Sequence, residues 1–219
     1  MKVITSKWEY VSNELNILYN KIFKGININD LSDYEKRKII FKYLCNNVKY
    51  DYKLLDKIKS RRRIPRDPYL EIESVLKNSI GICNSISQVY KLLLEKVNIY
   101  SLCVICDDGT DVKHQLNLVY DEYNNSFSFD DITSVIVDRG NIDEYFDYDI
   151  EDANSYNQGN KSVYKNYNWI YLSTGYIYAL VGRKDTSYFK HNIENKRELN
   201  FLSNINAKKK NKKLERRIK

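Results

Sequence analysis

Glycine, proline and cysteine are scarce in this chain, and each shortage excludes a class of protein. Seven glycines and two prolines among 219 residues exclude a linker-rich or low-complexity chain. Four cysteines are too few for a disulfide-dense secreted scaffold, so we expect reduced thiols. An apolar content of 42% is enough to build a sizeable core. The composition therefore predicts a single globular domain, which we place over residues 1–205.

Long apolar runs are lacking as well. No window approaches the run of about eighteen apolar residues that a transmembrane helix needs. Residues 1–15 contain no apolar stretch of the kind found in secretory signal peptides. We therefore expect no transmembrane segment and a cytoplasmic protein.

Acidic residues are nearly absent from one segment, residues 206–219. It contains eight basic residues and one acidic residue, and so accounts for the whole net charge of +7. Because the segment has little to bury, we expect a disordered tail. The tail is either simply solvated or binds a polyanion, such as nucleic acid or anionic lipid, by neutralising its phosphates. The rest of the chain is formally neutral, so the basicity does not identify a substrate.

Two helices are predicted by apolar spacing. Ser32 and Glu35 have the spacing of a capping box, and the apolar residues that follow predict a helix from Ser32 to about Val48. The basic stretch that follows residue 52 and contains Pro65 and Pro68 is predicted to be a loop. A stronger apolar stripe from Ile86 to Val97 predicts a second, core-facing helix.

The second helix begins at a cysteine and ends at an asparagine. Cys83 lies three residues before Ile86, so its thiol shares the face of the apolar stripe and points inward from the first turn. Asn98, after the last apolar position, is predicted to end the helix in the left-handed conformation. Taken alone, a cysteine on an apolar helical face is most often a packing residue.

Beyond the second helix the pattern alternates, which predicts strands. Three runs separated by turn residues are expected to form a meander: 100–106, 112–120 and 127–131. A second hairpin is expected within 163–181, with strands 164–172 and 176–181. The acidic stretch 138–160 between them is expected to be an excursion loop outside the core.

Strand alternation predicts which polar side chains point toward the Cys83 helix. His114 shares one face of its strand with the apolar residues Val112, Leu116 and Leu118, and this face should point toward the helix. By the same rule Asp131, and not Asp130, shares a face with Phe129. A carboxylate on an apolar face is costly unless it is paired, so we expect it to bond the imidazole.

These residue types together can perform nucleophilic catalysis. A thiolate is favoured at a helix N-terminus and beside an imidazole, and a carboxylate behind the imidazole holds its tautomer and stabilises its cationic form. Cys83 is therefore the candidate nucleophile, His114 the base and Asp131 the residue that orients it. The Cys83 backbone N–H is one candidate oxyanion donor. Tyr50 and Asn84 are the further candidates for oxyanion or substrate contacts.

The order of these motifs resembles the transglutaminase-like superfamily. Gly81-Ile82-Cys83 is similar to its nucleophile segment, His114-Gln115-Leu116-Asn117 to its His-x-x-Asn strand, and residues 129–133 to its strand ending in Asp-x-Thr. Val48-Lys49-Tyr50-Asp51 is similar to the end of its preceding helix. The resemblance covers residues 32–134. It implies an α+β, papain-like core in which the nucleophile helix packs on an antiparallel sheet.

The resemblance also implies an activity, namely cysteine-dependent acyl transfer on protein or peptide amides through a thioester. Peptide hydrolysis, glutamine deamidation and transamidation share that intermediate, so the sequence leaves all three open. No cofactor and no metal are implied. Cys103 and Cys106 would face opposite sides of a strand, which is unsuitable for zinc.

Two alternatives stay open at this point. The chain could be a catalytically inactive member of the same fold that serves as a binding module, tethered to a polyanion by its basic tail. It could also act on a small acyl donor, as the arylamine N-acetyltransferases do. The oligomeric state is not predicted.

Overall fold

Helices and strands alternate along the chain, and their order determines where the candidate site forms. The computed structural model describes residues 2–60, 68–107, 114–121, 126–149 and 168–172. In chain order the elements are α1 (Lys2–Ile22), the 3₁₀ helix η1 (Ile28–Asp30), α2 (Asp33–Asn47), β1 (Lys49–Tyr50), α3 (Tyr52–Lys59), α4 (Pro68–Asn78), β2 (Ile80–Gly81), α5 (Cys83–Lys96), β3 (Ser101–Asp107), β4 (His114–Asp121), β5 (Ser126–Asp130), α6 (Ile132–Asp138), α7 (Ile142–Tyr145), β6 (Tyr148–Asp149) and β7 (Asn168–Leu172). The fold is thus a mixture of helix and sheet, as expected for an α+β protein.

The larger sheet is antiparallel throughout the described residues. Its strand order is β6-β5-β4-β3-β7. The consecutive pairing of β3, β4 and β5 confirms the predicted meander. β7 pairs with β3 on the side away from β4, whereas the second predicted strand of that hairpin, 176–181, lies outside the described residues. A separate parallel pair joins β1 to β2.

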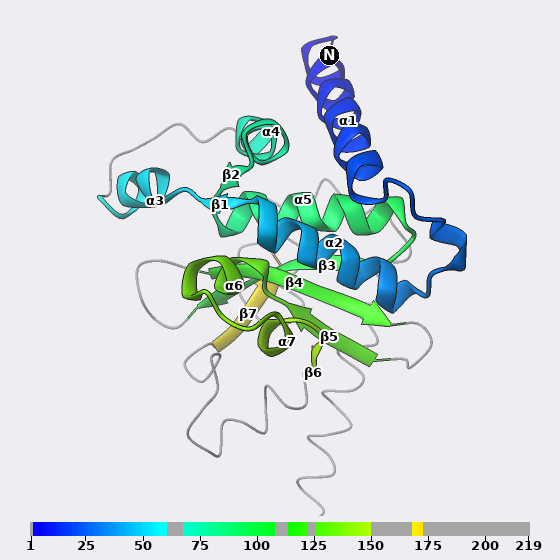
Figure 1. Cartoon of the computed structure of the whole chain (residues 1–219). Helices are drawn as coiled ribbons and strands as arrows, with labels where there is room; N and C mark the ends of the chain where they lie inside the picture. The colour runs from blue at the N-terminus through cyan, green and yellow to red at the C-terminus, as the bar shows by residue number, and fades with distance from the viewer. Residues whose placement is uncertain (1, 61–67, 108–113, 122–125, 150–167, 173–219) are drawn as a thin grey trace, which may run out of the picture.

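Helix α5 packs directly on the larger sheet. It contacts β3 and β4 and is covered by α1, α2 and α4, and Figure 1 shows α2 and α5 running side by side over the sheet. Ile86, Val89, Leu93 and Leu94 of α5 are fully buried. Each such side chain contributes about 1.5–3 kcal/mol by leaving water. The apolar stripe read from the sequence is therefore the centre of the core.

The predicted ends of both helices are confirmed. Ser32 caps α2: its hydroxyl accepts from the Glu35 backbone N–H at 3.2 Å, and the Glu35 carboxylate accepts from the Ser32 N–H at 2.8 Å. At the end of α5, Asn98 is left-handed with φ 62°. None of the described helices combines the length and apolar content needed to cross a bilayer.

The face of β4 that meets α5 is not the predicted one. Only His114, at the start of β4, reaches α5 from the predicted face, through the Cys83 thiol. Further along β4 the side chains that hydrogen-bond α5 belong to Gln115 and Asn117, which point to the opposite face from Leu116 and Leu118. Leu116 and Leu118 are themselves buried, so both faces of β4 are covered. Alternation separates the two faces of a strand, but it does not say which one meets the helix when neither faces water.

The acidic stretch after Asp138 is also corrected by the structure, because its described part contributes to the core. Tyr145 and Phe146 are buried, and Phe146 packs against Phe41 of α2 with ring centroids 5.1 Å apart. These two aromatic side chains thus anchor an otherwise polar segment in the core. Residues 150–160 of the same stretch lie outside the described residues.

Helices replace part of the predicted loop between residues 52 and 68. The Asp51 carboxylate accepts from the Leu54 N–H at 2.9 Å and caps α3, whose last turn includes Lys57 and Lys59 of the basic stretch. Residues 61–67 lie outside the described part, and α4 begins at Pro68. Proline is favourable at the first position of a helix, so it begins a helix here. The sequence patterns used above predict neither α4 nor α1.

A buried ion pair joins α2 to β5. The Arg37 guanidinium donates to both Asp130 oxygens, at 2.6 Å through Nε and 2.5 Å through Nη2, and to Asp147 at 2.8 Å. Tyr90 of α5 donates its hydroxyl to Asp130 at 2.7 Å, and the Asp147 N–H donates to it at 2.9 Å. Asp130 is completely buried. Its carboxylate thus receives four hydrogen bonds from residues of different segments.

Removing Arg37 should destabilise the fold strongly. Arg37→Met leaves Asp130 buried without its counter-charge, which should lower the free energy of unfolding by about 3–5 kcal/mol. Urea denaturation followed by circular dichroism measures this change. Lys36→Met is the matched control, because the Lys36 pair with the exposed Asp33 should contribute less than about 1 kcal/mol. Equal losses in the two variants would contradict a structural role for the buried pair.

Candidate active site

Cys83 is the first residue of α5, directly after the short strand β2. A side chain at Gly81 would place its Cβ 2.5 Å from Val75 and 2.6 Å from the Ser85 hydroxyl, so only glycine fits there. The Ser85 hydroxyl accepts from the Ile82 N–H at 3.2 Å and holds the turn into the helix. The half-buried thiol therefore lies at the positive end of the α5 dipole.

His114 and Asp131 meet beside this thiol. The His114 Nε2 atom lies 2.8 Å from the Asp131 Oδ2 atom, and the Cys83 thiol is hydrogen-bonded to the same imidazole. Because Nε2 is engaged by the carboxylate, Nδ1 is the ring nitrogen that faces the thiol. The structure thus brings together the three residues that the sequence singles out, in the order thiol, imidazole, carboxylate.

Asp131 reaches His114 from a helix cap. β5 ends at Asp130, and Asp131 is the N-cap of α6, where it accepts from the Ser134 N–H at 3.0 Å and from the Ser134 hydroxyl at 2.7 Å. Its side chain is completely buried. The adjacent Asp130 is equally buried but is taken up by Arg37. Two neighbouring carboxylates therefore have separate partners.

The pKa values of the three groups favour the charged pair. Burial raises the pKa of the Cys83 thiol, but the hydrogen bond and charge of His114 and the Gln115 backbone N–H outweigh it, so the net shift is downward. Burial lowers the pKa of His114, yet Asp131 and the thiolate hold it well above its ordinary value. Burial likewise opposes ionisation of Asp131, whose pKa is nevertheless lowered by His114 and Ser134. These three shifts favour a thiolate next to an imidazolium.

Tyr50 joins the site through the small parallel sheet. Tyr50 pairs with Gly81, and the Asp51 N–H donates to the Gly81 carbonyl at 2.8 Å. This pairing places the Tyr50 hydroxyl in hydrogen-bonding contact with Cys83. Burial and the neighbouring thiolate raise the pKa of Tyr50, so it remains a neutral donor at pH 7. The structure therefore brings this predicted residue to the thiol.

Asn84 was expected to contact the oxyanion or the substrate, and in the structure its side chain bonds two glutamines. Its amide nitrogen donates to the Gln115 side-chain oxygen at 2.9 Å, and its amide oxygen accepts from Gln88 at 2.8 Å. Gln115 also donates to the Ser87 hydroxyl at 3.1 Å. Asn84 thus belongs to the polar contact that holds the start of α5 against β4.

Sequence reasoning missed two residues of this site. Gln115 supplies its backbone N–H to the thiol and its side chain to the helix, and no sequence pattern distinguishes it from other strand residues. Ser134 bonds Asp131, and the Asp-x-x-Ser spacing of an N-cap could have revealed it. Within the described residues no group of three or more histidine, cysteine or acidic side chains is arranged to hold a metal ion.

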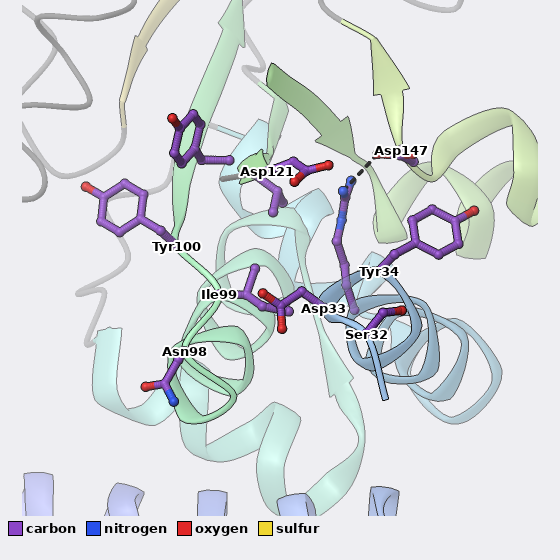
Figure 2. A pocket seen from close by; sticks show the side chains of 11 residues that line it. Ser32, Asp33, Tyr34, Asn98, Ile99, Tyr100, Asp121 and Asp147 are labelled. Carbon is purple, nitrogen blue, oxygen red and sulfur yellow. Dashed lines mark hydrogen bonds and ion pairs between the residues drawn. The ribbon is translucent and has the colours of Figure 1, made fainter. Parts of the chain in front are cut away.

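Two cavities of similar volume lie on the described surface. One, of about 600 Å³, is bordered by Tyr50 and by residues of α2, α6 and the turn after α6. The other has a volume of about 590 Å³. Cys83, His114 and Asp131 are not among the lining residues of either cavity, and the first cavity adjoins the site through Tyr50. Figure 2 shows Asp33, Asp121 and Asp147 around this second cavity, with Asp147 joined to the guanidinium of Arg37.

Comparison with known proteins was made with family models, curated proteins and solved structures. No family model matches the chain, and no curated protein matches it. One solved structure, described as the crystal structure of a transglutaminase, is similar over 59% of this chain, with a TM-score of 0.48 and 17% identity. The chain spans about a third of that protein, 33% of its length.

The pH dependence of thiol reactivity should reveal the charged pair. The alkylation rate of Cys83 by iodoacetamide should rise with a midpoint below the ordinary thiol pKa of about 8.5, because His114 stabilises the thiolate. Mass spectrometry locates the label. Cys45 is the internal control, since burial raises its pKa and should keep it unreactive.

The same measurement on Asp131→Asn tests the carboxylate. Asparagine still caps α6 but no longer stabilises the imidazolium, so the midpoint should move upward toward the ordinary value. A wild-type midpoint at or above about 8.5 would be incompatible with the thiolate–imidazolium pair.

Proposed function

We propose that this protein is a transglutaminase-like cysteine enzyme with a papain-like core, which transfers acyl groups from protein or peptide amides. The observation that supports the proposal is the continuous hydrogen-bonded series from Cys83 through His114 to Asp131 at the N-terminus of α5. This arrangement matches the general requirement for an activated nucleophile, a base and a group that orients the base. The three pKa shifts act in the direction that this chemistry needs.

The proposed reaction proceeds through a thioester. The Cys83 thiolate attacks the amide carbonyl carbon, and the resulting oxyanion accepts hydrogen bonds from the Cys83 backbone N–H and the Tyr50 hydroxyl. His114 gives its proton to the departing amine or ammonia as the carbon–nitrogen bond breaks. His114 then takes a proton from water or from an acceptor amine, which attacks the thioester and releases the thiolate. Asp131 keeps the imidazole oriented in both steps.

The proposal also covers the acyl acceptor, the cellular compartment and the role of the basic tail. Water as acceptor gives peptide hydrolysis or deamidation, and an amine gives transamidation. Cys45, Cys83 and Cys103 are free thiols, which is in keeping with a protein that acts in a reducing compartment such as the cytoplasm. The basic tail, 206–219, lies outside the described residues, so its binding of a polyanion stays a prediction.

Replacing the nucleophile should abolish the reaction. Cys83→Ala should lose the covalent acyl-enzyme that intact-mass spectrometry detects after incubation with a peptide mixture and an acid quench. Cys45→Ala is the control and should keep it, because Cys45 lies outside the triad. Incorporation of a fluorescent primary amine then reports an amine acceptor, whereas release of ammonia without such incorporation reports deamidation, with water as the acceptor. Turnover that survives in Cys83→Ala would overturn the proposal, whereas a wild-type protein with an ordinary Cys83 pKa would favour the inactive binding module.

Removing the Tyr50 hydroxyl should slow turnover and leave substrate binding nearly unchanged. Loss of one oxyanion donor typically lowers kcat by about 10²–10³. Tyr50→Phe should show this loss with little change in KM. Tyr52→Phe is a close control, because its ring packs against Tyr50 with centroids 5.1 Å apart while its side chain is exposed. Similar kcat values for the two variants would remove Tyr50 from the mechanism.

A further inference from the structure

A cavity of about 600 Å³ lies on the Tyr50 side of the candidate nucleophile. Its volume is within the range of ligand sites in proteins, roughly 300–1,000 Å³. Tyr50 belongs to both places, because it lines the cavity and its hydroxyl contacts Cys83. A molecule in the cavity would therefore contact Tyr50, whose hydroxyl reaches the thiol.

Apolar side chains form part of the lining of this cavity. Val48 and Val135 are buried, and Ile136 and Ile142 are partly buried against the same core. At the outside, Val137 is 38% exposed, although it is a large hydrophobic residue. Val137 therefore offers apolar contact area beside the polar part of the lining.

Two basic residues, Lys49 and Arg139, line the cavity, and both are exposed. Among the described residues no carboxylate belongs to the lining. Within the part of the chain that the structure describes, neither of them has an ion-pair partner. The other cavity, drawn in Figure 2, is lined by three carboxylates, from Asp33, Asp121 and Asp147. Two cavities of nearly equal size thus have opposite charge.

Arg139 occupies a backbone position that usually belongs to glycine. It ends α6 in the left-handed conformation, with φ 50° and ψ 35°. Glycine is preferred here, since a side chain costs roughly 1 kcal/mol. The glycine next to it, Gly140, serves another purpose, because a Cβ there would lie 2.4 Å from the Tyr145 ring. The cationic side chain at the cavity is therefore carried by a residue whose backbone conformation is unfavourable for most residues except glycine.

We propose that this cavity binds an acidic peptide segment of the acyl donor. The proposal rests on the proposed function, since it names the substrate class of the same site. Carboxylates of the peptide pair with Lys49 and Arg139, and a neighbouring apolar side chain packs on Val48 and Val135. The scissile amide then reaches Cys83 past the Tyr50 ring.

Binding can be tested without catalysis in the Cys83→Ala protein. The probe is a fluorescein-labelled peptide with a central glutamine, flanked by leucine and glutamates, and its partner has glutamines in place of the glutamates. Fluorescence anisotropy should show about threefold to tenfold tighter binding of the acidic peptide, the effect expected of two exposed ion pairs. Added salt should reduce the difference.

A pair of charge substitutions tests the assignment to this cavity. Lys49→Gln with Arg139→Gln should remove the preference for the acidic peptide, whereas Lys53→Gln with Lys59→Gln on α3, which leaves the lining unchanged, should retain it. Equal binding of the two peptides, or a preference that survives the first pair, would overturn the inference. Iodoacetamide labelling of wild-type Cys83 reports on the proposed function separately, because peptide binding in Cys83→Ala does not depend on thiol activation.

Discussion

The buried ion pair between Arg37 and Asp130 is the constraint on which the arrangement of the other elements depends. It joins α2 to β5, and the Tyr90 hydroxyl adds α5 to the same carboxylate. A buried charge is tolerated only when it is paired and its remaining hydrogen bonds are satisfied, so these three elements have little freedom to shift separately. Asp131 follows directly in the chain and carries the second carboxylate to His114. The position of the candidate site therefore follows from a contact that lies outside it.

A second constraint is the polar contact between α5 and β4. Asn117 donates to the Ser87 carbonyl at 3.0 Å, and Gln115 donates to Asn84 and Ser87. Such a contact fixes the register of helix on strand more narrowly than apolar packing does, because hydrogen bonds depend on distance and angle. It fixes the start of α5, which carries Cys83, against the strand that carries His114. In the proposed mechanism this is what keeps the thiol and the imidazole aligned through both halves of the reaction.

Local signals account for what could be predicted, and non-local packing accounts for what could not. The caps of α2 and α5 depend on residues within one turn, so Ser32, Glu35 and Asn98 were sufficient to place them. The burial of Tyr145 and Phe146 depends on α2, which precedes them by about a hundred positions in the sequence, and no local pattern reports it. Strand parity selected Asp131 over Asp130 as the partner of His114, but Asp131 lies beyond the end of β5 and reaches the imidazole from the N-cap of α6. Parity also did not identify the face of β4 that meets most of α5.

The sequence by itself determined the helix that carries Cys83, the strand that carries His114 and the candidacy of Asp131, because helical period, alternation and motif order are properties of neighbouring residues. Only the tertiary structure decided which face of β4 meets α5, what lies beside the thiol, and the opposite charges of the two cavities. The physical reason is that these features depend on contacts across long separations, such as the 93 positions between Arg37 and Asp130. Tyr50 illustrates both levels: its motif identified it as a candidate, and the pairing of β1 with β2 brought it to Cys83.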